Sequence, residues 1–166
     1  QSAILLPFLM SMVILSYIVY ALLSAENGLV NNSILPLFHM DPIQWYQKPK
    51  YWPAILIIAN CWKGVGYGCL IYIASLIGID PSFYEAARLD GASKWQEITK
   101  ITLPSLVPTI ITLLLLSIGR IFYSDFGLFY QVPMNSGVLV STTNVIDTYV
   151  YRALIEQGNI SMSSAA

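Results

Sequence analysis

Three long apolar stretches constrain this chain more than any other feature of its sequence. They cover residues 3–23, 53–77 and 105–123, and about 20 apolar residues in a helix span the roughly 30 Å hydrocarbon core of a membrane. Inside a bilayer the backbone must satisfy its own hydrogen bonds, so apolar stretches of this length predict helices. The sequence therefore predicts an all-α fold, a polytopic bundle of transmembrane helices.

The composition agrees with a membrane protein. Hydrophobic residues make up 56% of the chain and charged residues only 10%, whereas about a quarter of the residues of a soluble domain are charged. Eight Lys or Arg against nine Asp or Glu give a formal net charge of -1, so nothing points to a nucleic-acid partner. We expect residues 1–166 to form a single domain that is a fragment of a longer subunit.

The intervals between the apolar stretches predict the topology. Residues 80–104 lie on one side of the membrane, and residues 25–51 and 124–160 lie on the other. Aromatic side chains in the first interval suit a membrane interface. The connector at 80–104 has three basic residues and the first interval has two, a difference too small to decide which side is cytoplasmic.

A few polar side chains interrupt the second and third apolar stretches. Lys63 lies near the middle of its stretch, where an ionised side chain costs about 2.5–3.5 kcal/mol on insertion scales, so it should face protein or water and not lipid. Aromatic rings with a few hydrogen-bond donors suit sugar rings. Pairing between helices, or anchoring at the interface, is the alternative role for these residues. The candidates for a substrate pathway are Lys63, Tyr67, Tyr72, Arg120 and Tyr123.

The connector at 80–104 contains several residues that favour the start or the end of a helix. Asp80-Pro81 predicts a helix start, with an N-cap acceptor followed by proline at the first helical position. Gly91 predicts a left-handed stop after that helix. Ser93 and Gln96 have the spacing of a capping box, which predicts that a second helix begins shortly after Gly91. Leu103-Pro104 is expected to end the second helix and to begin the third apolar stretch.

The connector carries a spaced motif. It contains Glu85-Ala86-Ala87, then three residues, Gly91, nine residues, and Ile101-Thr-Leu103-Pro104. In this respect the chain resembles the integral-membrane permease subunits of binding-protein-dependent ABC importers. The runs at 78–81 and 90–96 look like the sugar-importing branch of that family. The runs at 125–130 and 145–152 look like its permeases for polysaccharide fragments.

The resemblance implies a multi-pass protein of the bacterial cytoplasmic (inner) membrane with a cytoplasmic coupling loop at 80–104. The first helix of that loop would dock in a cleft of a cytoplasmic ATPase subunit. Further implied partners are a second permease subunit, identical or different, an extracytoplasmic substrate-binding protein, and a sugar or oligosaccharide substrate. The docking positions are Glu85, Ala86, Ala87 and Gly91, with Arg88 and Asp90 as ion-pair partners.

The chain is not expected to be an enzyme. It has no Gly-x-x-x-x-Gly-Lys-Ser/Thr sequence to hold nucleotide phosphates, so it should bind no cofactor itself, and ATP with Mg²⁺ would belong to a partner. His39, the only histidine, has Asp41 nearby, but a metal site needs three or four ligands. The open alternatives are a permease for another small solute and a membrane channel or structural subunit.

Overall fold

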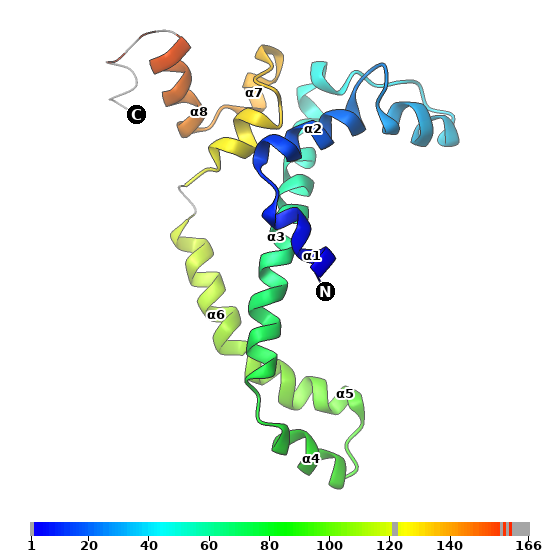
Figure 1. The fold of residues 1–166 in the computed structure, drawn as a ribbon, viewed down its shortest axis with the longest axis vertical. Helices are drawn as coiled ribbons and strands as arrows, with labels where there is room; N and C mark the ends of the chain where they lie inside the picture. The colour runs from blue at the N-terminus through cyan, green and yellow to red at the C-terminus, as the bar shows by residue number, and fades with distance from the viewer. Residues whose placement is uncertain (1, 121–122, 157, 159, 161–166) are drawn as a thin grey trace. The chain divides into compact units, whose positions relative to one another are not determined.

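The computed structural model describes residues 2–120, 123–156, 158 and 160, and all regular structure within them is helical (Figure 1). The all-α class predicted from the sequence is confirmed. The α-helices are α1 (Ser2–Leu9), α2 (Met12–Leu23), α3 (Trp52–Ile77), α4 (Pro81–Leu89), α5 (Lys94–Glu97), α6 (Leu103–Gly119), α7 (Val140–Thr143) and α8 (Ile146–Tyr151). The π-helical turns are Val30–Ile34, Ile98–Thr102, Gly127–Gln131 and Arg152–Glu156, and the short 3₁₀ turns are Pro36–Phe38, Trp45–Gln47, Pro49–Tyr51 and Gly137–Leu139.

The chain divides into two compact units. The first unit comprises Gln1–Gly64 together with Tyr123–Ala166, and the second comprises Val65–Phe122. Helix α3 begins in the first unit and ends in the second. The single domain and the membrane topology stay predictions, and residues 121–122 of the third predicted span lie outside the described residues.

The core of the first unit forms where α2, the start of α3 and the segment after residue 123 meet. Trp52 and Val132 are fully buried there, and Leu15 of α2 packs in the same cluster. The Trp52 indole nitrogen donates a hydrogen bond to the Trp45 carbonyl at 2.9 Å, so its polar edge is satisfied although the ring is buried. Residues 125–141, which lack helical periodicity, nevertheless fold into short helical turns because they pack against this core.

The first apolar stretch is not one helix. Helix α1 ends at Leu9 and α2 begins at Met12, and Ser11 caps α2 by accepting a hydrogen bond from the Ile14 amide at 3.3 Å. Serine competes for backbone hydrogen bonds and favours such cap positions, which is why an apolar run containing it can break here. Helix α2 alone, with 12 residues, is about 18 Å long and does not cover the bilayer core.

Two longer helical runs meet the requirement for a membrane span. Pro49–Ile77 has 29 residues and Lys94–Gly119 has 26, both sufficiently apolar to cross a bilayer. In the second unit the hydroxyls of Ser75 and Thr109 form a hydrogen bond between α3 and α6. No residue of α6 is buried, which suits a helix whose apolar side chains face lipid or the helices of a larger assembly.

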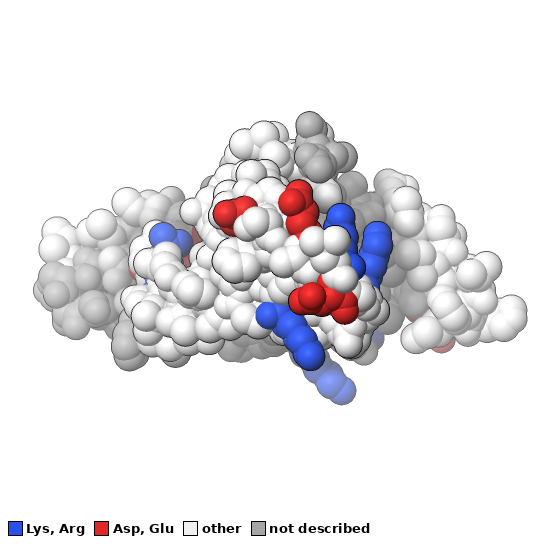
Figure 2. Space-filling model, turned by 90° about the horizontal axis from the view of Figure 1, so that it is seen from below, with Lys and Arg blue, Asp and Glu red and all other residues white. Residues whose placement is uncertain are grey.

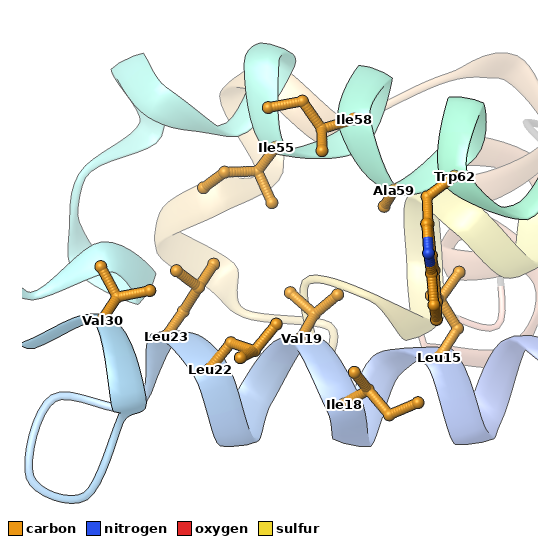
Figure 3. Close-up of a pocket in the computed structure, with 10 residues that line it drawn as sticks. All are labelled: Leu15, Ile18, Val19, Leu22, Leu23, Val30, Ile55, Ile58, Ala59 and Trp62. Carbon is orange, nitrogen blue, oxygen red and sulfur yellow. The ribbon is translucent and has the colours of Figure 1, made fainter. Parts of the chain in front are cut away.

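An apolar hollow of about 360 Å³ lies between α2 and α3 within the first unit (Figure 3). The lining side chains come from α2, from the π turn at Val30 and from α3, and they are Leu15, Ile18, Val19, Leu22, Leu23, Val30, Ile55, Ile58, Ala59 and Trp62. The Trp62 indole is the one lining side chain with a hydrogen-bonding group. The hollow is therefore a gap in apolar packing and offers little to a polar ligand.

Candidate functional site

The connector between α3 and α6 begins with a capped helix. The Asp80 carboxylate accepts a hydrogen bond from the Ser82 amide at 2.9 Å, and Pro81 occupies the first turn of α4. This backbone hydrogen bond is the main cause that lowers the pKa of Asp80 below its ordinary value of 3.8. The cap is therefore fully present above the ordinary pKa and is lost as the pH falls through the lowered one. The predicted start of the helix is confirmed.

Gly91 forms the elbow after α4. Its φ is +78°, a left-handed conformation that costs glycine little. The Gly91 amide donates to the Arg88 carbonyl at 3.1 Å and the Ala92 amide donates to the Ala87 carbonyl at 2.9 Å. This is the hydrogen-bond pattern of a Schellman motif. The predicted glycine stop is confirmed, and because no heavy atom lies within 4 Å of the position that a Cβ would occupy, only the backbone conformation requires glycine.

The second connector helix starts with the expected capping box. The Ser93 amide donates to the Gln96 side-chain oxygen at 2.8 Å, and the Gln96 amide donates to the Ser93 hydroxyl at 3.4 Å. Two amides at the helix start are thereby satisfied reciprocally. Gly91 and Ser93 together reverse the chain between α4 and α5 within a few residues.

The predicted end of this helix at Leu103-Pro104 is wrong. A continuous helical run extends from Lys94 to Gly119, and the π-helical turn Ile98–Thr102 lies immediately before the proline. There the Leu103 amide donates to the Ile98 carbonyl, five residues back. Proline has no amide to donate and crowds the preceding turn, and the wider π turn accommodates it without ending the helix.

Two side-chain contacts join α4 to the second connector helix. The Arg88 Nε donates to the Glu97 carboxylate at 3.0 Å, and Glu97 is only 8% exposed. The Tyr84 and Thr102 hydroxyls form a hydrogen bond at 2.9 Å. The contact with Glu97, first by its hydrogen bond and then by its charge, raises the pKa of Arg88. These contacts hold the two helices against each other on both sides of the elbow.

Glu97, Tyr84 and Thr102 are part of this site although the sequence alone does not predict them there. The only signal was that opposite charges at Arg88 and Glu97 lie nine residues apart across a predicted glycine elbow. A folded-back elbow can bring such residues together, but sequence spacing alone does not say which acidic residue the arginine would reach.

The predicted docking residues lie on α4 and at the elbow that follows it. Glu85, Ala86 and Asp90 are exposed, and Ala87 is half-buried. Figure 2 views the end of the molecule where α4 and α5 lie, and it shows acidic and basic side chains interspersed on that surface. The connector has four acidic residues (Asp80, Glu85, Asp90 and Glu97) and three basic ones (Arg88, Lys94 and Lys100).

A hollow of about 310 Å³ lies on the inner side of the elbow. Ala87, Asp90 and Gly91 contribute to it from the first helix and its stop, and Glu97 and Lys100 contribute from the second. Trp95 and Ile98 are 72% and 47% exposed. The element therefore presents small side chains, an exposed indole and charges of both signs, which is a surface suited to a protein or membrane interface.

The five candidates for a substrate pathway are divided between the two units. The Lys63 ammonium donates to the carbonyls of Phe8, at 3.2 Å, and of Met10, next to the break between α1 and α2. Tyr67 is exposed and Tyr72 is half-buried along α3. Arg120 caps the end of α6 and Tyr123 is 75% exposed. Whether these side chains share one cavity stays a prediction.

No group of three or more His, Cys, Asp or Glu residues is placed to hold a metal ion within the described part of the chain. His39 has a left-handed φ of +53° in the turn after Pro36–Phe38. It therefore serves as the residue that ends a short helical turn.

Comparison with known proteins places this architecture in one family. A family model described as "Binding-protein-dependent transport system inner membrane component" matches residues 3–150. The polygalacturonan/rhamnogalacturonan transport system permease protein YteP of Bacillus subtilis is 33% identical over 170 residues, covering 99% of this chain and 50% of that protein. The lactose transport system permease protein LacF of Rhizobium radiobacter is 32% identical over 153 residues, covering 91% of this chain and 50% of that protein.

Solved structures give the same result. A chain of a bacterial alginate ABC transporter, crystallised in complex with an alginate pentasaccharide-bound periplasmic protein, matches with a TM-score of 0.87 and 34% sequence identity. The match covers 99% of this chain and 56% of that one. The chain thus spans about half the length of the relatives that it matches.

Proposed function

Because the chain belongs to the family of binding-protein-dependent transport system inner membrane components, we propose that it is part of the permease subunit of an ATP-driven importer for sugars or oligosaccharides. The observation that carries the proposal is the connector, where Glu85-Ala86-Ala87 lies on a capped helix that ends in a glycine elbow. The names of relatives that transport polygalacturonan, rhamnogalacturonan and lactose support a saccharide substrate.

In this proposal the connector links the membrane helices to a separate ATPase. The chain has no sequence for binding nucleotide phosphates, so ATP hydrolysis takes place on the partner. The Arg88–Glu97 and Tyr84–Thr102 contacts make the two connector helices move together. Closure of two ATPase subunits would shift this element as a rigid lever, and a pair of permease subunits would then alternate between outward-open and inward-open states.

The test is reconstitution of the full-length subunit with its second permease and ATPase in lipid vesicles. Uptake of labelled oligosaccharides is measured with the substrate-binding protein present, with and without ATP. We expect uptake only with ATP and expect the ATPase to copurify with the permease. Uptake that proceeds without ATP, or a permease that retains no ATPase, would identify a channel or a structural subunit instead.

The substrate pathway is proposed to include Lys63, Tyr67, Tyr72, Arg120 and Tyr123. Lys63→Met is expected to lower uptake by about threefold, because an ammonium that both fixes the α1–α2 break and faces the pathway contributes about one hydrogen bond to the passing sugar. Uptake and the thermal stability of the purified transporter are measured together. Lys63→Arg, which keeps donors for the Phe8 and Met10 carbonyls, is the matched control. Unchanged uptake in Lys63→Met would remove Lys63 from the pathway.

A further inference from the structure

A small hollow in the first unit, lined by both polar and apolar side chains, is not used by the coupling element or by the five pathway candidates. It has a volume of about 240 Å³ and lies between α2 and the segment that begins with the turn Gly127–Gln131. Tyr17 lines it from α2, and Tyr130, Gln131 and Asn135 line it from the other side. Pockets for drug-sized ligands have volumes of about 300–1,000 Å³, so this hollow has room for a single ring.

The Tyr130 ring is a fixed wall of the hollow. It stacks on Phe126 with ring centroids 4.9 Å apart and planes inclined by 15°, and it meets the Tyr151 ring edge to face at 5.0 Å. The Arg152 guanidinium lies 5.9 Å from the Tyr130 ring centroid. Contacts with three side chains hold the ring in one orientation, so a ligand in the hollow would not have to order it first.

The turn that carries the opposite part of the lining has an unusual backbone. Met134 and Asn135 both have left-handed φ values, 54° and 47°. Asn135 tolerates this conformation, whereas it strains a methionine. Two hydrogen bonds fix the Asn135 side-chain amide. Its oxygen accepts from Arg152 Nε at 3.2 Å, and its nitrogen donates to the Glu156 carboxylate at 2.9 Å. Such locally strained but well-supported backbone occurs preferentially at binding sites.

Hydrogen-bonding groups without partners face this hollow. Among the described residues, the Gln131 side-chain amide and the Tyr17 hydroxyl form no hydrogen bond, although both residues line it. An amide offers two donors and an acceptor, and a phenol offers one donor and an acceptor. None of the seven lining residues carries a charge at neutral pH.

We propose that this hollow is a subsite for one uncharged pyranose ring of the transported oligosaccharide, an inference that rests on the proposed function. The sugar would lie in the hollow beside Tyr130, and its hydroxyls would pair with Gln131 and Tyr17. Neighbouring sugar hydroxyls each donate and accept, which matches the mixed donors and acceptors of an amide and a phenol. The nearest cation, Arg152, already donates to the Asn135 and Asn144 side chains, so a uronic acid carboxylate would lose water here without a free cation to replace it. The subsite therefore favours neutral over acidic rings.

The experiment uses the complete transporter reconstituted in vesicles with its binding protein. Uptake of a neutral oligosaccharide and of a uronate oligosaccharide is compared for the parent, Gln131→Leu and Tyr17→Leu. Each variant is expected to lose about fivefold in uptake of the neutral substrate, as for the loss of a hydrogen bond in binding. Tyr149→Leu, which removes a half-buried tyrosine of the same unit outside the hollow, is the matched control and should retain parental uptake.

A second measurement detects occupancy directly. Gln131→Cys is introduced after the two native cysteines, Cys61 and Cys69, are replaced by serine. Labelling of this cysteine with a maleimide should be slowed at least about fivefold by the neutral oligosaccharide and less by the uronate. Because labelling needs only assembled protein in the membrane, it reports on the hollow even if a variant transports poorly.

The outcomes separate the two hypotheses. If the parent transports oligosaccharides but the leucine variants match it and the cysteine is not protected, the subsite is wrong and the proposed function stands. Equal loss of neutral and acidic uptake, with equal protection by both, would overturn the preference for a neutral ring. A parent that imports no saccharide of either kind would overturn the proposed function and the subsite with it.

Discussion

Gly91→Val is expected to lower ATP-driven uptake by about tenfold while the permease still inserts into the membrane. The left-handed conformation at Gly91, with φ of +78°, costs a residue with a side chain roughly 1–2 kcal/mol, and about 1.4 kcal/mol corresponds to a factor of ten. No neighbouring atom would meet the Cβ of the new side chain. The strain therefore falls on the elbow, and relieving it would change the angle between α4 and α5.

Two further variants make this prediction specific. Gly91→Asn should retain most of the uptake, because asparagine adopts the left-handed conformation more readily than valine. Gly137→Val adds the same side chain at a glycine that also has open space around it but has no left-handed φ, and it should leave coupling unchanged. Uptake and copurification of the ATPase are measured for all three. Normal uptake with full ATPase retention in Gly91→Val would show that the elbow is not the coupling joint.

Removal of Arg88 is expected to have an effect of similar size. Arg88→Met leaves the Glu97 carboxylate, which is 8% exposed, without its charged partner. Because a hydrogen bond to a charged group contributes more than one between neutral groups, we expect the rate of coupled uptake to fall by about tenfold. Because the Tyr84–Thr102 hydrogen bond alone would then have to hold the two helices together, α4 should no longer follow the second connector helix. The measurement is the rate of ATP-driven uptake per ATPase bound.

A double-mutant cycle separates this internal role from a contact with the ATPase. Glu97→Gln keeps the shape of the side chain and removes its charge, so Arg88→Met combined with Glu97→Gln should recover much of the loss. If Arg88 acts instead by pairing with the ATPase, the double variant will be as defective as Arg88→Met alone. Recovery would thus assign Arg88 to the rigidity of the connector.

The local structure of the connector was predictable because it depends on neighbours in the chain. The Asp80 cap, the Gly91 stop and the Ser93–Gln96 capping box each involve hydrogen bonds between residues at most five positions apart. Residue type and spacing are enough to specify such bonds. The helix was wrongly predicted to end at Leu103-Pro104 for a related reason. A π turn can absorb a proline, and nothing in the local sequence distinguishes that outcome from a stop.

The contacts of Lys63 show where sequence reasoning reached its limit. A charge in an apolar stretch predicted that Lys63 must find protein or water, and its partners are the carbonyls of Phe8 and Met10, more than 50 residues earlier. Those carbonyls lie where the first apolar stretch breaks, between the end of α1 at Leu9 and the start of α2 at Met12. The partner was therefore created by the fold, and no spacing in the sequence indicates it.

By itself the sequence determined the helical class, the apolar stretches and the capped elbow that follows Glu85-Ala86-Ala87. These follow from hydrophobic length and from hydrogen bonds within a single turn, which the chain encodes locally. Only the tertiary structure decided that Arg88 pairs with Glu97 and that Tyr130 and Gln131 line a hollow beside α2. Those contacts join separate elements, and side chains far apart in sequence meet only where the packing of the helices brings them together.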